Sequence, residues 1–252
     1  MLFRSRRRWK LSTVQLGVWM KYLIVNGDDF GASRGVNRGI MEVHERGALT
    51  STSLMIAMPA AAEAVELAKR APKLSVGLHV ALTDEQMTPS VDFDDAKACA
   101  AEIQAQIDAF SNQMGCLPTH LDTHQNVHRD ERLRPLFQEA AARHYLPLRE
   151  HSPVRYFSNF YGQWDDGLSH PEHISVENLL RMLRSELDAD DSIVELSCHP
   201  GYVGTDFDSP YNVEREIELK TLTDPKFLAF LDRKSTRLNS SHEIPSRMPS
   251  SA

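Results

Sequence analysis

The chain has 252 residues, of which 41% are hydrophobic and 25% charged, a composition that excludes a disordered, collagen-like or disulfide-rich miniature protein. No run approaches the roughly 20 apolar residues that a membrane helix needs, so no membrane partner is expected. The net charge of −7 conceals an acidic middle, because residues 22–232 hold 18 basic and 34 acidic side chains. Such a charge repels a phosphate backbone, which argues against nucleic acid as a partner.

The two ends of the chain differ from its middle. Residues 1–20 are rich in arginine and end at Met20, directly before a strand-like segment, so we interpret them as a non-structural N-terminal extension. Residues 232–252 are rich in serine and lack apolar periodicity, which indicates a disordered tail or sequence foreign to the protein. A single domain is therefore expected over residues 21–231. Its sparse cysteines (Cys99, Cys116 and Cys198, with no CxxC pair) are typical of reduced thiols in the cytoplasm.

Strand and helix patterns alternate along this domain. The first strand, Tyr22–Asn26, is a short apolar run, and Ser33 is placed to cap the helix that follows it. The later elements expected in chain order are a strand at Ser51–Ile56, a helix at Pro59–Arg70, a strand at Ser75–Val80, a helix at Asp94–Met114, a strand at Thr119–Asp122, a helix at Glu131–Arg143, a strand at Leu146–Arg149, loops over 151–173, a helix at Val176–Leu187, a strand at Ile193–Cys198 and helices at Glu214–Lys220 and Pro225–Leu231.

Strands that are each followed by a helix predict a parallel sheet, because parallel neighbours need crossover connections. A closed or nearly closed β/α barrel and an open doubly wound sheet both satisfy this pattern. No GxGxxG or GxxxxGK[ST] motif follows any strand, which argues against a nucleotide-binding sheet.

The polar residues with reactive side chains lie where the expected strands end. In a β/α barrel these ends open on one face, where active sites are built. The residues in such positions are Asp28, Asp29, His79, His120, Asp122, His124, Arg149 and His199.

Two aspartates in succession, Asp28 and Asp29, have two possible roles. One carboxylate can bind a divalent metal while the other acts as a general base, or the pair can simply cap the next helix or fix a turn. Histidines at three other strand ends favour the first interpretation. His79 alone, inside an apolar strand, would be typical of a core histidine.

His120, Asp122 and His124 alternate, so an extended chain would direct all three to one face. If the backbone turns helical at Thr123, His124 instead pairs with His128 four residues later. Both geometries include His124. An aspartate with two histidines suits Zn, Mn, Co or Fe(II) and leaves positions for water and substrate. The aromatic residues of loop 154–165 could stack on a sugar or form a small satellite core.

Six sequence blocks together resemble the YdjC-like carbohydrate deacetylases, a family that includes enzymes associated with hopanoid biosynthesis. The blocks are NGDDFGAS, VNRGI, LTSTSLM, VGLHVALT, PTHLDTHQNVH and ELSCHPGY, in the family's order between about Lys21 and Leu231. The resemblance implies an α/β fold, a deformed and incomplete (β/α) barrel in a single domain. It also implies hydrolysis of an N-acetyl group on an amino sugar or oligosaccharide, with one divalent metal ion (Mg, Zn, Mn or Co). Family members are often dimeric, so a homodimer is one expected partner state.

The resemblance also assigns roles to individual residues. Asp29, His79 and His124 match the family's metal ligands, Asp28 matches the catalytic base, and His199 matches the general acid. Arg149 matches a residue that orients the base or holds the substrate.

The sequence departs from the family pattern in three respects. Gly27 replaces an alanine of the NADDFG block, Asn126 stands where some members have histidine, and the chain enters its serine-rich tail where the family has a further strand.

The two alternative functions are a different metal-dependent hydrolase, such as a phosphoesterase, and a non-catalytic sugar-binding or regulatory protein. Only Arg149 among the strand ends could hold a phosphate, and binding alone needs no acid, base and metal ligands together.

Overall fold

The computed structural model describes residues 21–165, 167–189, 193–232 and 236–238. The predicted extension at 1–20 and most of the predicted tail at 232–252 lie outside these residues. The helices are α1 (Arg34–Glu45), α2 (Ala61–Arg70), α3 (Ala96–Met114), α4 (Arg134–His144), α5 (Val176–Ala189), α6 (Asn212–Leu222) and α7 (Pro225–Leu231), with 3-10 helices η1 (His124–Arg129) and η2 (Pro171–Ile174). The strands are β1 (Lys21–Phe30), β2 (Ser51–Leu54), β3 (Ser75–Val80), β4 (Leu121–Thr123), β5 (Arg155–Phe157), β6 (Gln163–Trp164), β7 (Leu168–Ser169), β8 (Ile193–Cys198) and β9 (Thr236–Leu238).

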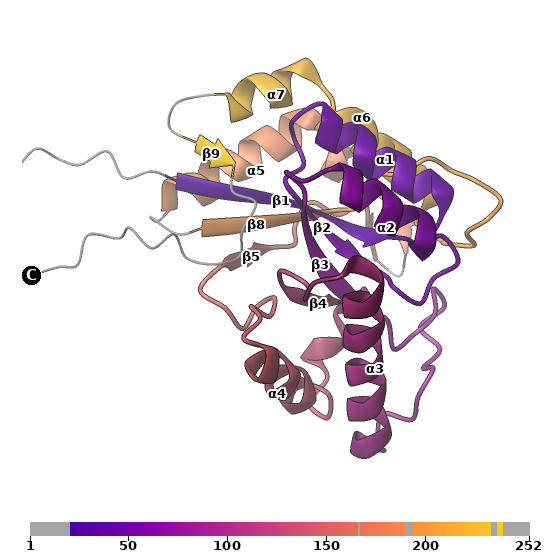
Figure 1. Ribbon diagram of the computed structural model, residues 1–252. Helices are drawn as coiled ribbons and strands as arrows, with labels where there is room; N and C mark the ends of the chain where they lie inside the picture. The colour runs from indigo at the N-terminus through magenta and orange to yellow at the C-terminus, as the bar shows by residue number, and fades with distance from the viewer. Residues whose placement is uncertain (1–20, 166, 190–192, 233–235, 239–252) are drawn as a thin grey trace, which may run out of the picture.

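The main sheet is parallel throughout and follows the order β4-β3-β2-β1-β8-β5, with β9 paired to β1 beside this path. It curls into a half-barrel that the helices surround (Figure 1). The chain is therefore an incomplete (β/α) barrel in a single domain, as predicted. Strands β2 and β8 are buried along their whole length, as strands of a parallel sheet covered on both faces are, although β2 reads Ser-Thr-Ser-Leu and β8 includes Glu195 and Ser197.

Local signals fixed several helix ends as expected. The Ser33 hydroxyl accepts a hydrogen bond from the backbone N–H of Val36 and caps α1. Gly115 ends α3 in the left-handed conformation, with φ of 79°, a conformation that glycine adopts without steric cost.

The strand predicted at Leu146–Arg149 is wrong. Leu148 forms only an isolated bridge with Leu121. Pro147 cannot donate to a ladder, and Glu150 turns the chain with a φ of 63°. The strand that pairs with β8 is β5, which lies in the segment predicted to be loop. The same segment also forms the short antiparallel hairpin β6–β7.

The C-terminal segment also differs from expectation in part. Thr236–Leu238, within the predicted tail, forms β9 and pairs in parallel with the start of β1. The chain therefore continues into a short strand after α7, within residues that we expected to be a structureless tail.

Helix α1 packs with its backbone directly on the segment that follows β8. A Cβ atom on Gly39 would lie 2.6 Å from Gly201 Cα and 2.9 Å from the Pro200 carbonyl oxygen. These are backbone atoms, which cannot rotate away as a side chain can.

We therefore expect Gly39→Ala to lower the free energy of unfolding by about 1–3 kcal/mol, because overpacking strains a close contact. Helix propensity alone acts in the opposite direction, since alanine stabilises a helix by about 1 kcal/mol relative to glycine. Urea unfolding of the two proteins distinguishes these effects by sign, and a more stable variant would contradict the packing account.

Candidate functional site

A pocket of about 440 Å³ lies at the carboxyl ends of β1, β3, β4 and β8. Its lining includes Asp28, Asp29, His79, His124 and His199, which the sequence placed at four separate strand ends. The fold thus brings together residues up to 171 positions apart in the chain, as the barrel prediction requires.

A bulge in β1 explains how two successive aspartates face one pocket. Neighbouring residues of a regular strand point to opposite faces. The register between β1 and β2 shifts between Gly27 and Phe30, and Asp29 has a φ of 67°. Aspartate tolerates this left-handed conformation better than most residues, and a bulge re-aims side chains next to a site. Asp28 and Asp29 consequently both line the pocket.

Arg149 holds the carboxylate of Asp28 through two hydrogen bonds. The Arg149 Nη1 and Nη2 atoms donate to the two carboxylate oxygens of Asp28 at 2.7 and 2.8 Å. Burial alone would raise the pKa of Asp28, but the charge and hydrogen bonds of Arg149 outweigh burial and hold this pKa well below its usual value. Asp28 is therefore ionised at neutral pH.

Arg149 itself does not line the pocket. Its side chain is 1% exposed and also contacts Asp122 Oδ2 at 2.7 Å and Glu195 Oε1 at 2.7 Å. Of the two roles that the sequence left open for Arg149, this geometry favours orienting the base over holding the substrate.

Asp29, His79 and His124 form a buried group whose ligand atoms all lie within 4.8 Å of one another. Asp29 Oδ1 is 3.2 Å from His79 Nε2 and 3.3 Å from His124 Nδ1. One carboxylate oxygen and two imidazole nitrogens are a donor set for Zn, Mn, Co or Fe(II).

The surroundings of these three residues fit a metal ion. His79 Nδ1 lies 2.7 Å from Asp122 Oδ1, the carboxylate–histidine arrangement that orients a metal-ligating ring. Burial lowers the pKa of His79, but Asp122, Asp29 and Asp28 outweigh burial and raise this pKa to about 10. An electrostatic field that favours a proton this strongly also favours a bound cation at the same place.

His199 also lies close to Asp28, with its Nε2 atom 3.9 Å from Asp28 Oδ2. Glu218, fully buried on α6, accepts a hydrogen bond from the His199 backbone N–H, and its Oε1 lies 3.7 Å from His199 Nδ1. Burial lowers the pKa of His199, but the hydrogen bond and charge of Glu218, with the charges of Asp29 and Asp28, raise it overall. Glu218 also accepts from the Tyr211 hydroxyl at 2.7 Å, which fixes its orientation.

Other predicted site residues lie outside the pocket lining. Asp122 is fully buried and contacts His79 and Arg149. The His120 ring packs against Gly77, on which a Cβ atom would lie 2.3 Å from the ring. The His128 Nε2 atom lies 3.0 Å from Glu150 Oε2. Neither an extended chain through His124 nor a helix from Thr123 therefore describes the whole of residues 120–128, although both predictions included His124.

Sequence reasoning missed Glu218 and Arg215, both on α6. The Nη2 atom of Arg215 donates to Asp29 Oδ2 at 2.7 Å, and its charge helps to hold the pKa of Asp29 well below the usual value, against the opposing effect of burial. Neither residue follows an expected strand, so the pattern that located the other site residues does not include them. The one available signal is the presence of charged residues on the buried face of an otherwise amphipathic helix.

The aromatic loop forms one wall of the pocket. Tyr156, Phe160, Tyr161 and Trp164 all line the pocket, and the Tyr161 ring stacks on the Tyr211 ring with centroids 4.6 Å apart. Phe157 instead belongs to the main hydrophobic core. The loop therefore lines the pocket and also contributes to the main core, so it does not form a separate satellite core, and stacking on a sugar stays a prediction.

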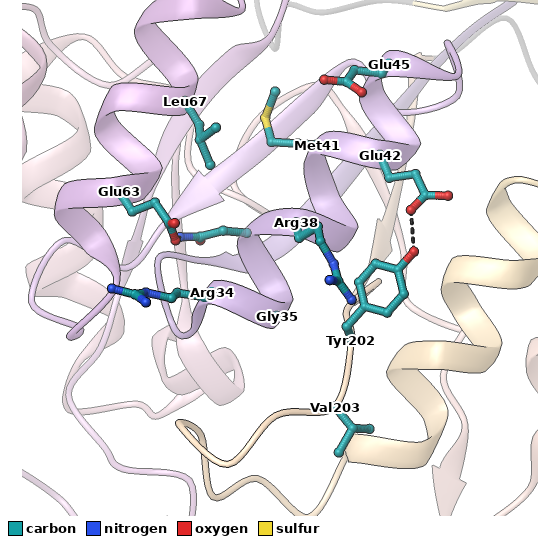
Figure 2. Close-up of a pocket in the computed structure, with 11 residues that line it drawn as sticks. Arg34, Gly35, Arg38, Met41, Glu42, Glu45, Glu63, Leu67, Tyr202 and Val203 are labelled. Atoms are coloured by element: carbon teal, nitrogen blue, oxygen red, sulfur yellow. Dashed lines mark hydrogen bonds between the residues drawn. The ribbon is translucent and has the colours of Figure 1, made fainter.

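A larger groove of about 710 Å³ lies elsewhere, between α1, α2 and the segment after β8 (Figure 2). The Arg38 guanidinium carbon lies 3.6 Å from the centre of the Tyr202 ring, and the Tyr202 hydroxyl donates to Glu42. No histidine or cysteine lines this groove. Size is thus a poor guide here, and the smaller pocket contains the residues suited to chemistry.

The fold and the pocket together define a β/α-barrel protein whose pocket gathers carboxylates and histidines on the face where such barrels place active sites. The family model for YdjC-like protein matches residues 22–233. The chain therefore belongs to the YdjC-like family.

Several relatives are similar over most of their length. The chain is 34% identical to a carbohydrate deacetylase of Geobacillus stearothermophilus, over 86% of this chain and 96% of the relative. It is 32% identical to a carbohydrate deacetylase of Vibrio parahaemolyticus, over 81% of this chain and 88% of the relative. A crystal structure of a proposed cellobiose-phosphate cleavage protein from Enterococcus faecalis matches with a TM-score of 0.76 and 26% identity, covering 88% of this chain and 98% of that one.

A more distant structure supports the fold alone. A CE4 esterase of Streptococcus mutans matches with a TM-score of 0.57 at 13% identity, over 87% of this chain and 85% of that one. Among the described residues, no helix is long and apolar enough to cross a membrane.

Proposed function

We propose that the protein is a metal-dependent carbohydrate deacetylase that hydrolyses the N-acetyl group of an acetylated amino sugar or oligosaccharide. The observation that carries this proposal is that an ionised Asp28 lies beside His199 in the same pocket as the Asp29–His79–His124 group. The similarity to curated carbohydrate deacetylases supports the same activity.

Asp29, His79 and His124 would hold one divalent ion, with Mg, Zn, Mn and Co as candidates. When bound, such an ion polarises the amide carbonyl and lowers the pKa of water from 15.7 towards about 7. Asp122 supports this set by orienting His79.

Asp28 is proposed to take a proton from the attacking water, whose oxygen forms a bond to the carbonyl carbon. His199 then donates a proton to the sugar nitrogen as the C–N bond breaks, because an amide nitrogen leaves poorly without protonation. The products are acetate and a free amino sugar. Arg149 keeps the Asp28 carboxylate aimed into the pocket.

The aromatic wall supports a sugar as the substrate. Tyr161, Trp164 and Tyr211 line the pocket, and sugar rings pack their C–H faces on aromatic side chains. We further propose that residues 21–231 form the catalytic domain and that the protein acts in the cytoplasm, where its free cysteines stay reduced. A homodimer is also proposed.

The test is acetate release from N-acetylglucosamine and short chitooligosaccharides by metal-loaded protein, with the free amine counted alongside. Equal amounts of acetate and amine are expected. Phosphate release from sugar phosphates without acetate release would favour the phosphoesterase alternative, and sugar binding with neither product would favour the binding protein.

The Glu218–His199 contact gives a pH prediction. His199 must be protonated to act as an acid, so activity should fall as pH rises through its elevated pKa. Glu218→Gln removes the nearest negative charge and lowers that pKa, so the alkaline fall of kcat should begin at lower pH. A pH profile of kcat tests this, with Glu139→Gln on the exposed face of α4 as the control. An unchanged alkaline limb in Glu218→Gln would contradict the role of Glu218.

A further inference from the structure

A second group of metal-type ligands lies outside the pocket, next to the β6–β7 hairpin. His170, Glu172 and His173 each offer one ligand atom, and these atoms lie within 4.8 Å of one another. Glu172 is exposed and both histidines are half-buried, so an ion can reach the group directly from solvent.

The backbone holds the two histidines side by side. The His170 backbone N–H donates to the Gly162 carbonyl at 2.7 Å, and the His173 N–H donates to the His170 carbonyl at 3.0 Å. Residues three apart in a 3-10 turn lie one above the other. The two imidazole rings accordingly stack, with centroids 5.3 Å apart and planes inclined by 21°.

His170 has carboxylates near both of its ring nitrogens. Its Nδ1 atom lies 3.1 Å from Glu172 Oε1, and its Nε2 atom lies 3.5 Å from Asp165 Oδ2. The Nε2 atom is buried and makes no hydrogen bond within the described residues. Buried polar atoms normally have a hydrogen-bond partner or a ligand, so this nitrogen is available to a cation.

We propose that His170, Glu172 and His173 form a second site for a borderline divalent cation such as Zn²⁺. Two imidazoles with carboxylates suit Zn²⁺, Ni²⁺ and Cu²⁺ better than Mg²⁺ or Ca²⁺, which prefer oxygen ligands alone. When the ion binds, one ring nitrogen of His170 and one of His173 turn towards it, which separates the two stacked rings. Solvent exposure makes this site weaker than the buried group in the pocket.

The position of the site gives it a consequence for the pocket, which rests on the proposed function. His170 directly follows β7 of the β6–β7 hairpin, and the His173 ring lies 6.2 Å from the ring of Trp164, the last residue of β6. Trp164 lines the pocket. An ion held here therefore ties the hairpin to η2 and fixes one aromatic wall of the substrate site.

Calorimetric titration of the chelator-stripped full chain with Zn²⁺ tests the proposal by counting sites. Wild type is expected to bind two equivalents, and the double variant H170A/H173A one. Asp29→Asn, which disables the pocket group, is expected to retain the weaker equivalent. His144→Ala, a half-buried histidine on α4 outside any ligand group, is the matched control and should keep both.

Hydrogen exchange locates the weaker site. In Asp29→Asn, Zn²⁺ should slow amide exchange in peptides covering residues 162–173, and this protection should disappear when H170A/H173A is added. A double variant H170A/H173A that still binds two equivalents, or exchange unaffected by Zn²⁺, would overturn the proposal. A third outcome is possible: wild type binds one equivalent of Zn²⁺, and only H170A/H173A abolishes this binding. That result would support the second site and contradict the metal site in the pocket.

Discussion

Asp28→Asn is expected to lower kcat for acetate release by about 10²–10⁴-fold, the usual contribution of a general base. The amide has nearly the shape of the carboxylate but cannot accept the proton of the attacking water. The variant should still bind metal, because Asp28 is not one of the proposed ligands Asp29, His79 and His124, although the loss of one nearby negative charge should lower the affinity. Steady-state kinetics with calorimetry on the same samples measures both quantities.

The control for this variant is Asp108→Asn, which makes the same chemical change at an exposed residue of α3 that pairs with Gln104. Its kcat should equal that of wild type. If Asp28→Asn kept full activity with bound metal, the assignment of Asp28 as the base would be wrong.

Arg149→Met should lower the free energy of unfolding by about 3–5 kcal/mol, because it removes the cation from a buried group of carboxylates. One guanidinium contacts three buried carboxylates, those of Asp28, Asp122 and Glu195. Methionine fills much of the same space but leaves these carboxylates without their cation. A loss of this size is a large share of the 5–15 kcal/mol that stabilises a typical domain.

Arg149→Lys separates charge from geometry at this position. Lysine keeps the positive charge but cannot form the two-pronged contact with Asp28, so we expect a smaller loss of stability and a substantial loss of kcat. Urea unfolding and acetate release measure the two effects. An Arg149→Met protein as stable as wild type would show that the carboxylates are balanced by other groups.

Much of the fold could be predicted from local patterns. Strands β3 and β8 and helix α7 have the predicted bounds, because a buried parallel strand and a capped helix leave strong signals in the sequence. Leu146–Arg149 misled the prediction because a short apolar run is equally compatible with a buried loop. The pairing of β5 with β8 depends on contacts between distant segments, which periodicity cannot reveal.

The candidate site was predictable where it follows strand ends and not where it depends on helices or bulges. Asp29, His79 and His124 do meet in space, but the bulge at Asp29 has no marker beyond a residue type that tolerates positive φ. Arg215 and Glu218 come from α6, whose distance from the strands in sequence conceals their contacts with Asp29 and His199.

The most direct test of the account is acetate release by protein stripped with a chelator and then supplied separately with Zn, Mn, Co or Mg. The account predicts no release from folded, stripped wild type, restoration by at least one metal, and no restoration in Asp29→Asn. Full activity of the stripped protein, or equal restoration of Asp29→Asn, would contradict a metal held by Asp29, His79 and His124 as the basis of catalysis.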